Sequence, residues 1–250
     1  IIGSLMVSSS ALIQNLTIGK GGGSLDSNTA VGFLSLTSNT TGYNNTAVGA
    51  YSMGSNNTGF FNTSLGFNSL SQNTSGNANT AIGQDSLKFN TTGGSNSSLG
   101  SFSMQITTTG FSNTGVGVSS LRYNTTGYNN VSLGESSLIN LLTGYNNVAI
   151  GKSSGENTSS GSYGNIYIGP NSGPSSSLEE NNKLYINNNS GTPLIGGDFY
   201  SGSVTINDIL ILSRRNTTPS NPQEGMIISS GSVGNSILYY YNGTSWNSLF

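Results

Sequence analysis

The chain has 250 residues and a formal net charge of −2, carried by only seven basic and nine acidic side chains. Charged residues make up 6% of the sequence, against about 25% in an average soluble protein. The chain contains no cysteine and no histidine, which excludes disulfides, thiolate chemistry, zinc sites built on Cys or His, and triads with an imidazole base. We expect no cofactor, no metal site, no nucleic-acid partner and, because the apolar runs are short, no membrane insertion.

Residues 1–24 are predicted to form strands that cap the array that follows them. Apolar and polar residues alternate around Leu5, Val7, Leu16 and Ile18. The open end of a stack of strands leaves backbone groups unpaired, so a capping strand is favoured there.

Residues 25–169 repeat with a period of 17 residues. One glycine recurs at this spacing, as Gly32, Gly49, Gly66, Gly83, Gly100, Gly117, Gly134 and Gly151. Four residues before each of them stands an asparagine, namely Asn28, Asn45, Asn62, Asn79, Asn96, Asn113, Asn130 and Asn147. A second glycine series runs with the same spacing from Gly42 to Gly161. A degenerate ninth copy, residues 165–169, arrives one residue late and is predicted to end the array.

Each unit is predicted to contain two short strands and two turns. In the first copy the strands are residues 28–31 and a segment centred on Ser35 and Leu36. Glycine at both corners would supply the positive φ that a tight reversal needs. The predicted fold class is therefore all-β: a parallel β-roll or β-solenoid of eight to nine 17-residue coils, stacked about 4.8 Å apart.

The array is predicted to associate with other copies along its length. Each coil offers few large apolar side chains, such as Val31 and Leu36 in the first, so a lone array would be marginally stable. Ala30 and Val31 point to opposite faces of a strand. We expect the large residues to fill the coil and the small ones to let a neighbouring chain approach closely. The small column comprises Ala30, Ala47, Ser64, Ala81, Ser98, Gly115, Ser132 and Ala149.

The period is lost after residue 169, and Pro170 and Pro174 mark a boundary. Residues 170–213 are predicted to form a β neck, because residues 183–212 hold three apolar stretches separated by Gly and Asn. We expect strands of different chains to pair in this neck. Residues 214–250 are predicted to form a small β-module, with an Asn242-Gly243 turn between its last two strands.

The carboxylates do not indicate catalysis. Asp85 and Glu135 lie about three coils apart, too far within one chain for the carboxylate pair of a glycoside hydrolase. Glu179 and Glu180 are adjacent in a loop-like stretch, where solvated side chains are expected. We predict that the protein is not an enzyme.

Two polar columns each have a structural and a functional interpretation. Asparagines such as Asn39, Asn62, Asn73 and Asn124 fit the glycosylation pattern Asn-x-Ser/Thr, but a strict column is also typical of stacked amides that bond to one another. We favour the stacked amides. The Thr/Ser column that begins at Thr41 could form an ice-binding face, although turn chemistry explains it more simply.

Aromatic residues gather in two places. One column follows the second glycine series and comprises Tyr43, Phe60, Phe111, Tyr128 and Tyr145. We expect these rings to pack between coils or chains, with a stacking platform for glycans as the functional alternative. Tyr239, Tyr240, Tyr241 and Trp246 in the last module are the candidate receptor- or glycan-binding residues.

The repeat strings at residues 45–49 and 79–83 resemble the head repeats of trimeric autotransporter adhesins, which are parallel β-rolls assembled as trimers. The sequence is more similar to fibre proteins of tailed bacteriophages. That resemblance is carried by residues 16–23, the Asn-Thr-Thr-Gly turns, and residues 183–186, 193–199 and 238–246.

The resemblance implies a homotrimeric structural fibre of a bacteriophage virion, whose rigid shaft presents a tip that recognises the host surface. The expected partners are further copies of the chain, other virion proteins at one end, and a host receptor, with polysaccharide as the expected chemistry. The alternative is the head of a trimeric adhesin on a bacterial cell surface. An ice-binding β-solenoid is the minor alternative.

Overall fold

The structure is a computed structural model that describes residues 10–13, 16–24, 27–177, 179–207, 214–215, 222, 227–232 and 235–248. The chain folds into two compact units, residues 1–207 and residues 208–250. Each unit is described by itself.

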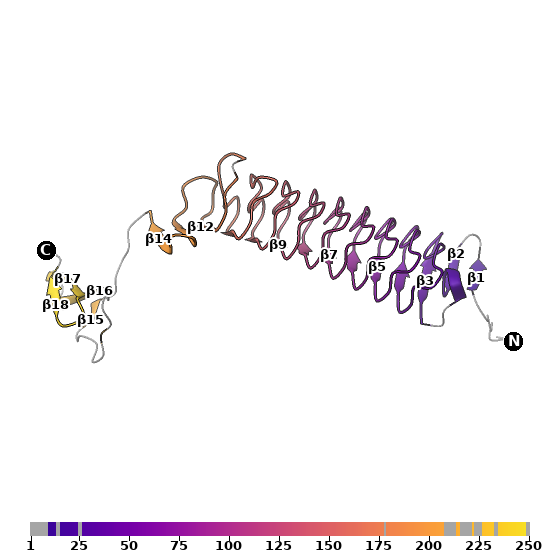
Figure 1. The fold of residues 1–250 in the computed structure, drawn as a ribbon, viewed down its shortest axis with the longest axis horizontal. Coiled ribbons are helices and arrows are strands. Elements are labelled where there is room, and N and C mark those ends of the chain that lie inside the picture. The colour runs from indigo at the N-terminus through magenta and orange to yellow at the C-terminus, as the bar shows by residue number, and fades with distance from the viewer. Residues whose placement is uncertain are drawn as a thin grey trace. The chain divides into compact units, whose positions relative to one another are not determined.

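The first unit is a parallel β-solenoid, which confirms the predicted fold class (Figure 1). Each strand pairs with the strand one coil later, and Ala30 lies opposite Ala47 and Ala47 opposite Ser64. Successive copies of the 17-residue unit therefore lie directly over one another. The stacked strands are β3 (Thr29–Gly32), β4 (Thr46–Val48), β5 (Thr63–Leu65), β6 (Thr80–Ile82), β7 (Ser97–Leu99), β8 (Thr114–Val116), β9 (Val131–Leu133), β10 (Val148–Ile150), β11 (Ile166–Ile168) and β12 (Lys183–Ile186).

The prediction that the array ends at residue 169 is wrong. Strand β12 continues the parallel stack, with Leu184 opposite Ile166. The step between these two residues is 18 positions, and the intervening segment no longer matches the repeat sequence. The 17-residue period of the sequence therefore does not extend to this coil.

Both ends of the stack are closed by antiparallel strands. At the first end, β1 (Ser10–Ile13) and β2 (Leu16–Gly19) form a hairpin, β2 pairs antiparallel with β3, and η1 (Gly22–Ser24) follows. At the other end, β13 (Ile195–Asp198) and β14 (Ser203–Ile206) pair antiparallel with β12 and with each other. These two strands belong to the predicted neck, and within the chain they continue the sheet of the solenoid.

Each coil has one strand, not two. The segment around Ser35 and Leu36 is a turn, because Leu34 and Leu36 have φ values of 52° and 51°. An extended strand requires negative φ. The segment still bonds to the next coil, since Leu36 N donates to Ser52 O at 3.0 Å. Left-handed conformations at leucine oppose the ordinary preference of L-residues, so the residue types gave no sign of them.

The two glycine series serve different purposes. Gly32 has a φ of 142°, as expected for a corner glycine, and a Cβ there would lie 2.4 Å from Gly49 O. Gly42 has no positive φ, so the prediction that both corners need it is wrong. A Cβ on Gly42 would instead lie 2.3 Å from Gly59 O and 2.4 Å from Asn39 Oδ1. Glycine is needed at the second corner because neighbouring coils approach closely.

The strand has the opposite orientation to the one predicted, whereas Leu36 and its counterparts point into the coil as expected. The small column, from Ala30 to Ala149, points into the coil and is buried, whereas Val31 and its counterparts point outward. Leucine and methionine side chains from the facing turn fill the interior, and each is fully buried. They are Leu36, Met53, Leu70, Leu87, Met104, Leu121 and Leu138. The remaining space is narrow: a Cβ on Gly115 would lie 2.9 Å from Ser103 Oγ. No residue larger than alanine or serine stands in this column from β3 to β10.

The second unit is a small four-stranded sheet, which confirms the predicted C-terminal module. It comprises β15 (Arg214–Arg215), β16 (Ile227–Ser232), β17 (Asn235–Tyr241) and β18 (Trp246–Ser248). Strand β15 is parallel to β16, and the other pairs are antiparallel. Asn242 Oδ1 accepts hydrogen bonds from the backbone of Thr244 and Ser245, which fixes the turn between β17 and β18.

Candidate interaction surfaces

An aliphatic stripe runs along the outer face of the parallel sheet. Each strand from β3 to β12 contributes one outward aliphatic residue at the same register position, and adjacent residues are separated by one coil. Leu65 and Leu99 are 47% and 48% exposed. The stripe comprises Val31, Val48, Leu65, Ile82, Leu99, Val116, Leu133, Ile150, Ile168 and Ile186. Large contiguous apolar surfaces are typical of protein interfaces.

An aromatic ladder follows one corner of the coils. Phe111, Tyr128, Tyr145 and Tyr163 stack in sequence, with ring centroids 4.9 Å apart and planes within 3° of parallel. Tyr43 stacks on Phe60 in the same way at 5.0 Å. Stacking between coils occupies the ring faces, which accounts for this column without a ligand. The ring spacing also measures the rise per coil.

The asparagines that precede the first glycine series form an internal amide ladder. Asn96 is typical: its Nδ2 donates to Asn79 Oδ1 at 3.2 Å and to Gly110 O at 2.8 Å. Its Oδ1 accepts from Asn113 N at 3.0 Å. The ladder provides hydrogen-bond partners for backbone groups at the corner, such as Gly110 O and Asn113 N, which do not pair with a neighbouring strand.

A second amide ladder lies at the other corner of the coil. Asn56 Nδ2 donates to Asn39 Oδ1 at 3.0 Å, and Asn73 Nδ2 donates to Asn56 Oδ1 at 2.7 Å. It is interrupted where Thr107 replaces asparagine, and Asn90 Oδ1 has no hydrogen-bond partner there. Asn39, Asn62, Asn73 and Asn124 are at most 3% exposed, so the folded coil leaves no room for a sugar on them.

The structure provides most of the candidate carboxylates with partners. Asp85 pairs with Lys88 at 3.4 Å, and Glu135 pairs with Lys152 at 3.1 Å. Glu180 accepts a hydrogen bond from Tyr185 Oη at 2.5 Å. Within the described ranges, no three acidic side chains gather as they would around a metal ion.

The C-terminal aromatic residues divide between the two faces of their sheet. Tyr241 lies opposite Trp246 in the register, and their rings are 5.3 Å apart. Tyr240 points to the other face and is 38% exposed. The structure therefore brings two of the four candidate residues together and leaves Tyr240 accessible on the opposite face.

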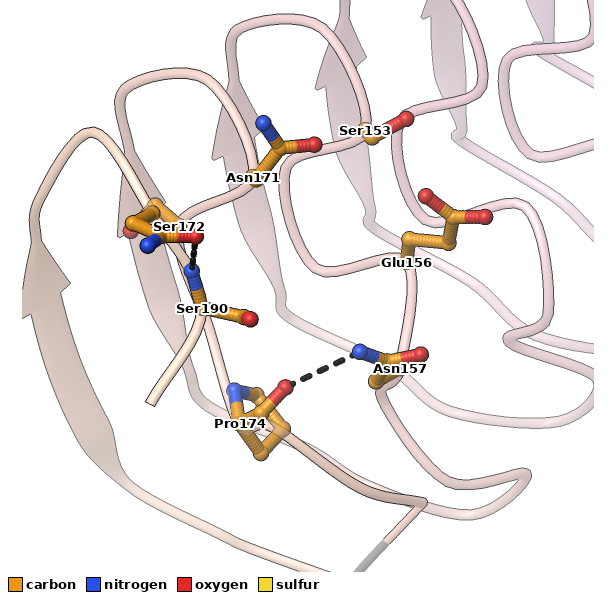
Figure 2. Close-up of a pocket in the computed structure, with 8 residues that line it drawn as sticks. Ser153, Glu156, Asn157, Asn171, Ser172, Pro174 and Ser190 are labelled. Atoms are coloured by element: carbon orange, nitrogen blue, oxygen red, sulfur yellow. Dashed lines mark hydrogen bonds between the residues drawn. The ribbon is translucent and has the colours of Figure 1, made fainter. Parts of the chain in front are cut away.

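A polar hollow of about 230 Å³ lies in the last coils of the solenoid (Figure 2). Its walls come from three separate stretches of the chain, at residues 153–157, 171–174 and 189–190. The hollow could not be predicted from the sequence, because its residues share no motif and only the stacking of coils brings them together.

A buried tyrosine ends the core of the solenoid. Tyr167 occupies the place of the small column in its coil and is fully buried, and its ring lies 5.7 Å from that of Tyr185. Burial raises the pKa of the Tyr167 hydroxyl well above its usual value of 10.0. Burial, followed by the hydrogen bond to Glu180, raises the pKa of Tyr185 as well.

These shifts predict alkaline destabilisation. The unfolded chain loses the phenolic protons above about pH 10, whereas the folded chain retains them. The contribution of these tyrosines to the free energy of unfolding is therefore fully present below that pH and decreases as the pH rises further. We expect the melting temperature to fall more steeply above pH 10 in the wild type than in Tyr167→Phe. Tyr200→Phe, at a side chain that is 90% exposed, should behave like the wild type. Equal slopes in all three proteins would contradict the prediction.

No family model matches the chain, and comparisons with curated proteins and with solved structures found no match either. In the part of the chain that the structure describes, no helix has the length and hydropathy of a membrane span.

Proposed function

We propose that the protein is a structural fibre component whose solenoid forms the rigid shaft of a homotrimer. The observation that carries this proposal is the aliphatic stripe. An apolar column that extends over ten successive strands would be unfavourable in water, because each side chain loses the stabilisation that burial provides. A shaft that holds a recognition surface away from its base requires no catalytic group.

The spacing of the stripe favours another copy of this chain as the partner. Its residues recur at the coil rise of about 4.9 Å, as the stacked rings show. A partner that covers every one of them needs the same period, and an identical coil array has it. Three chains with their stripes turned toward a common axis would bury all three columns, and the resemblance to fibre proteins favours three over two.

We further propose that the fibre belongs to a bacteriophage virion, where it binds other virion proteins at one end and a host-surface polysaccharide at its recognition tip. The support is the resemblance of the repeats, together with an exposed Tyr240 in the C-terminal unit. Tyr239, Tyr241 and Trp246 are the other residues proposed for that tip. A bacterial adhesin head with the same trimeric shaft is the second candidate, favoured by the similarity of its repeats.

The mass of the assembly that the full chain forms in solution tests this proposal. Light scattering after size exclusion should give about three times the chain mass of 25.7 kDa. Substituting Leu65→Asp and Leu99→Asp together places charges in the centre of the stripe, where burying them without a partner is costly. We expect this variant to dissociate or to fail to assemble at micromolar concentration.

Leu142→Asp is the matched control, because Leu142 is 40% exposed but lies outside the sheet. It should retain the trimer mass. A wild-type chain that remains folded and monomeric on dilution would refute the proposed assembly, as would a trimer that the stripe variant leaves intact. Electron microscopy of virions labelled with an antibody against the chain would test the bacteriophage assignment.

A further inference from the structure

The polar hollow of Figure 2 is built where the regular coils end. Ser153, Glu156 and Asn157 come from the coil that begins with β10, and Asn171 comes from the next coil. Asn189 and Ser190 close the hollow from the segment between β12 and β13. Figure 2 shows the side chains of Ser153, Glu156 and Asn171 around one space.

Several hydrogen-bonding groups in the hollow are left unused by the fold. Two lining side chains are already engaged: Asn157 Nδ2 donates to Pro174 O at 3.2 Å, and Asn189 Oδ1 accepts from Ser190 N at 2.9 Å. The carboxylate of Glu156, the amide of Asn171 and the hydroxyl of Ser153 make no hydrogen bond or ion pair with the described residues. The hollow is therefore lined by donors and acceptors that the fold leaves free.

The lining restricts which ligand could use these groups. Pro174 is the only apolar side chain in the lining, so an apolar ligand would make few favourable contacts. An anion would be repelled by Glu156, which forms no ion pair with a described residue. A calcium or magnesium ion requires several oxygen ligands and usually more than one carboxylate, whereas the hollow has one. A neutral polyol remains, because its hydroxyls both donate and accept hydrogen bonds.

We propose that this hollow binds one neutral hexopyranose unit of a polysaccharide. Glu156 accepts hydrogen bonds from adjacent sugar hydroxyls, and the Asn171 amide donates to one oxygen and accepts from another hydroxyl. Carbohydrate binding here goes beyond the proposed shaft function and is separate from the aromatic tip. It requires only one chain, so it does not depend on the trimer.

Saturation-transfer NMR with the full chain tests this assignment, using D-glucose, D-galactose and D-mannose at millimolar concentration as probes. We expect at least one hexose to receive saturation from the wild type. Hydrogen bonds to a charged group are among the strongest of this kind, so Glu156→Ala should reduce the transfer about tenfold. Asn171→Ala should reduce it as well.

Glu179→Ala is the matched control, since Glu179 is an exposed carboxylate outside the hollow. It should leave the transfer unchanged. Glu156→Ala and Glu179→Ala should melt within about 1 °C of the wild type, because surface substitutions that remove no structural contact change stability little. Asn171→Ala should melt lower than these two, because Asn171 has a φ of 54°, a left-handed conformation that alanine adopts at a cost of about 1 kcal/mol. A structural role for Glu156 would instead lower the melting temperature.

Three results would overturn the proposal. The first is a wild-type chain that receives no transfer from any of the three hexoses. The second is transfer that persists at the wild-type level in both Glu156→Ala and Asn171→Ala, which would place the sugar elsewhere. The third is transfer that appears only after calcium is added, which would make the hollow a cation site.

Discussion

Asn96→Leu is expected to destabilise the solenoid strongly. The leucine leaves Gly110 O and Asn113 N without partners, since Asn96 bonds to them at 2.8 and 3.0 Å. Both lie inside the coil, and Asn96 is fully buried. Each orphaned buried group costs about 1–3 kcal/mol, so the free energy of unfolding should fall by about 2–6 kcal/mol. Urea denaturation followed by circular dichroism measures it.

Asn140→Leu provides the control for this prediction. Asn140 is exposed, and its single hydrogen bond, from Nδ2 to Glu156 O at 2.9 Å, can be replaced by water. We expect a loss below about 1 kcal/mol. If the two variants lost the same stability, the internal ladder would not be the source of the effect, and the corner would have to be held by the glycines alone.

Gly155→Leu should give the second large effect, although it restores the residue type of the earlier coils. Leucine stands at this place in most coils with a φ near 50°, and Gly155 has a φ of 65°, so the backbone accepts it. A Cβ on Gly155 would, however, lie 2.7 Å from Leu138 Cδ2 and 2.8 Å from Tyr167 Cδ2. Overpacking of this kind costs about 3 kcal/mol. Thermal unfolding of the variant measures the loss.

Substitution of Tyr167, whose ring lies next to Gly155, tests whether the two positions share one space. Tyr167→Ala alone should cost about 3–5 kcal/mol, because it leaves a cavity in place of a ring. Gly155→Leu with Tyr167→Ala recreates the leucine–alanine pair of the other coils. The double variant should therefore be at least about 2 kcal/mol more stable than the sum of the single losses predicts. Strictly additive losses would show that the two positions do not share one space.

The repeat determined much of this structure without coordinates. A strict period with invariant glycine and asparagine columns is satisfied only when each copy lies over the last, because identical corner and amide contacts then form at every step. The parallel stack, its register and the amide column follow from that requirement. The need for glycine at both corners follows as well, but only the structure shows that Gly32 needs it for a positive φ and Gly42 for the close approach of neighbouring coils.

The tertiary structure decided which face of the strand is inside. Alternation shows that Ala30 and Val31 point apart, but both faces of such a strand are apolar enough to be buried. The alanine side lies inside because the coil is narrow and Leu36 from the facing turn already fills its interior. That turn depends on left-handed leucine, methionine and tyrosine, which their local preferences oppose and only the stacked hydrogen bonds of adjacent coils stabilise. The hollow beside Glu156 likewise exists only because three distant stretches meet there, and contacts between distant stretches leave no periodic sign in the sequence.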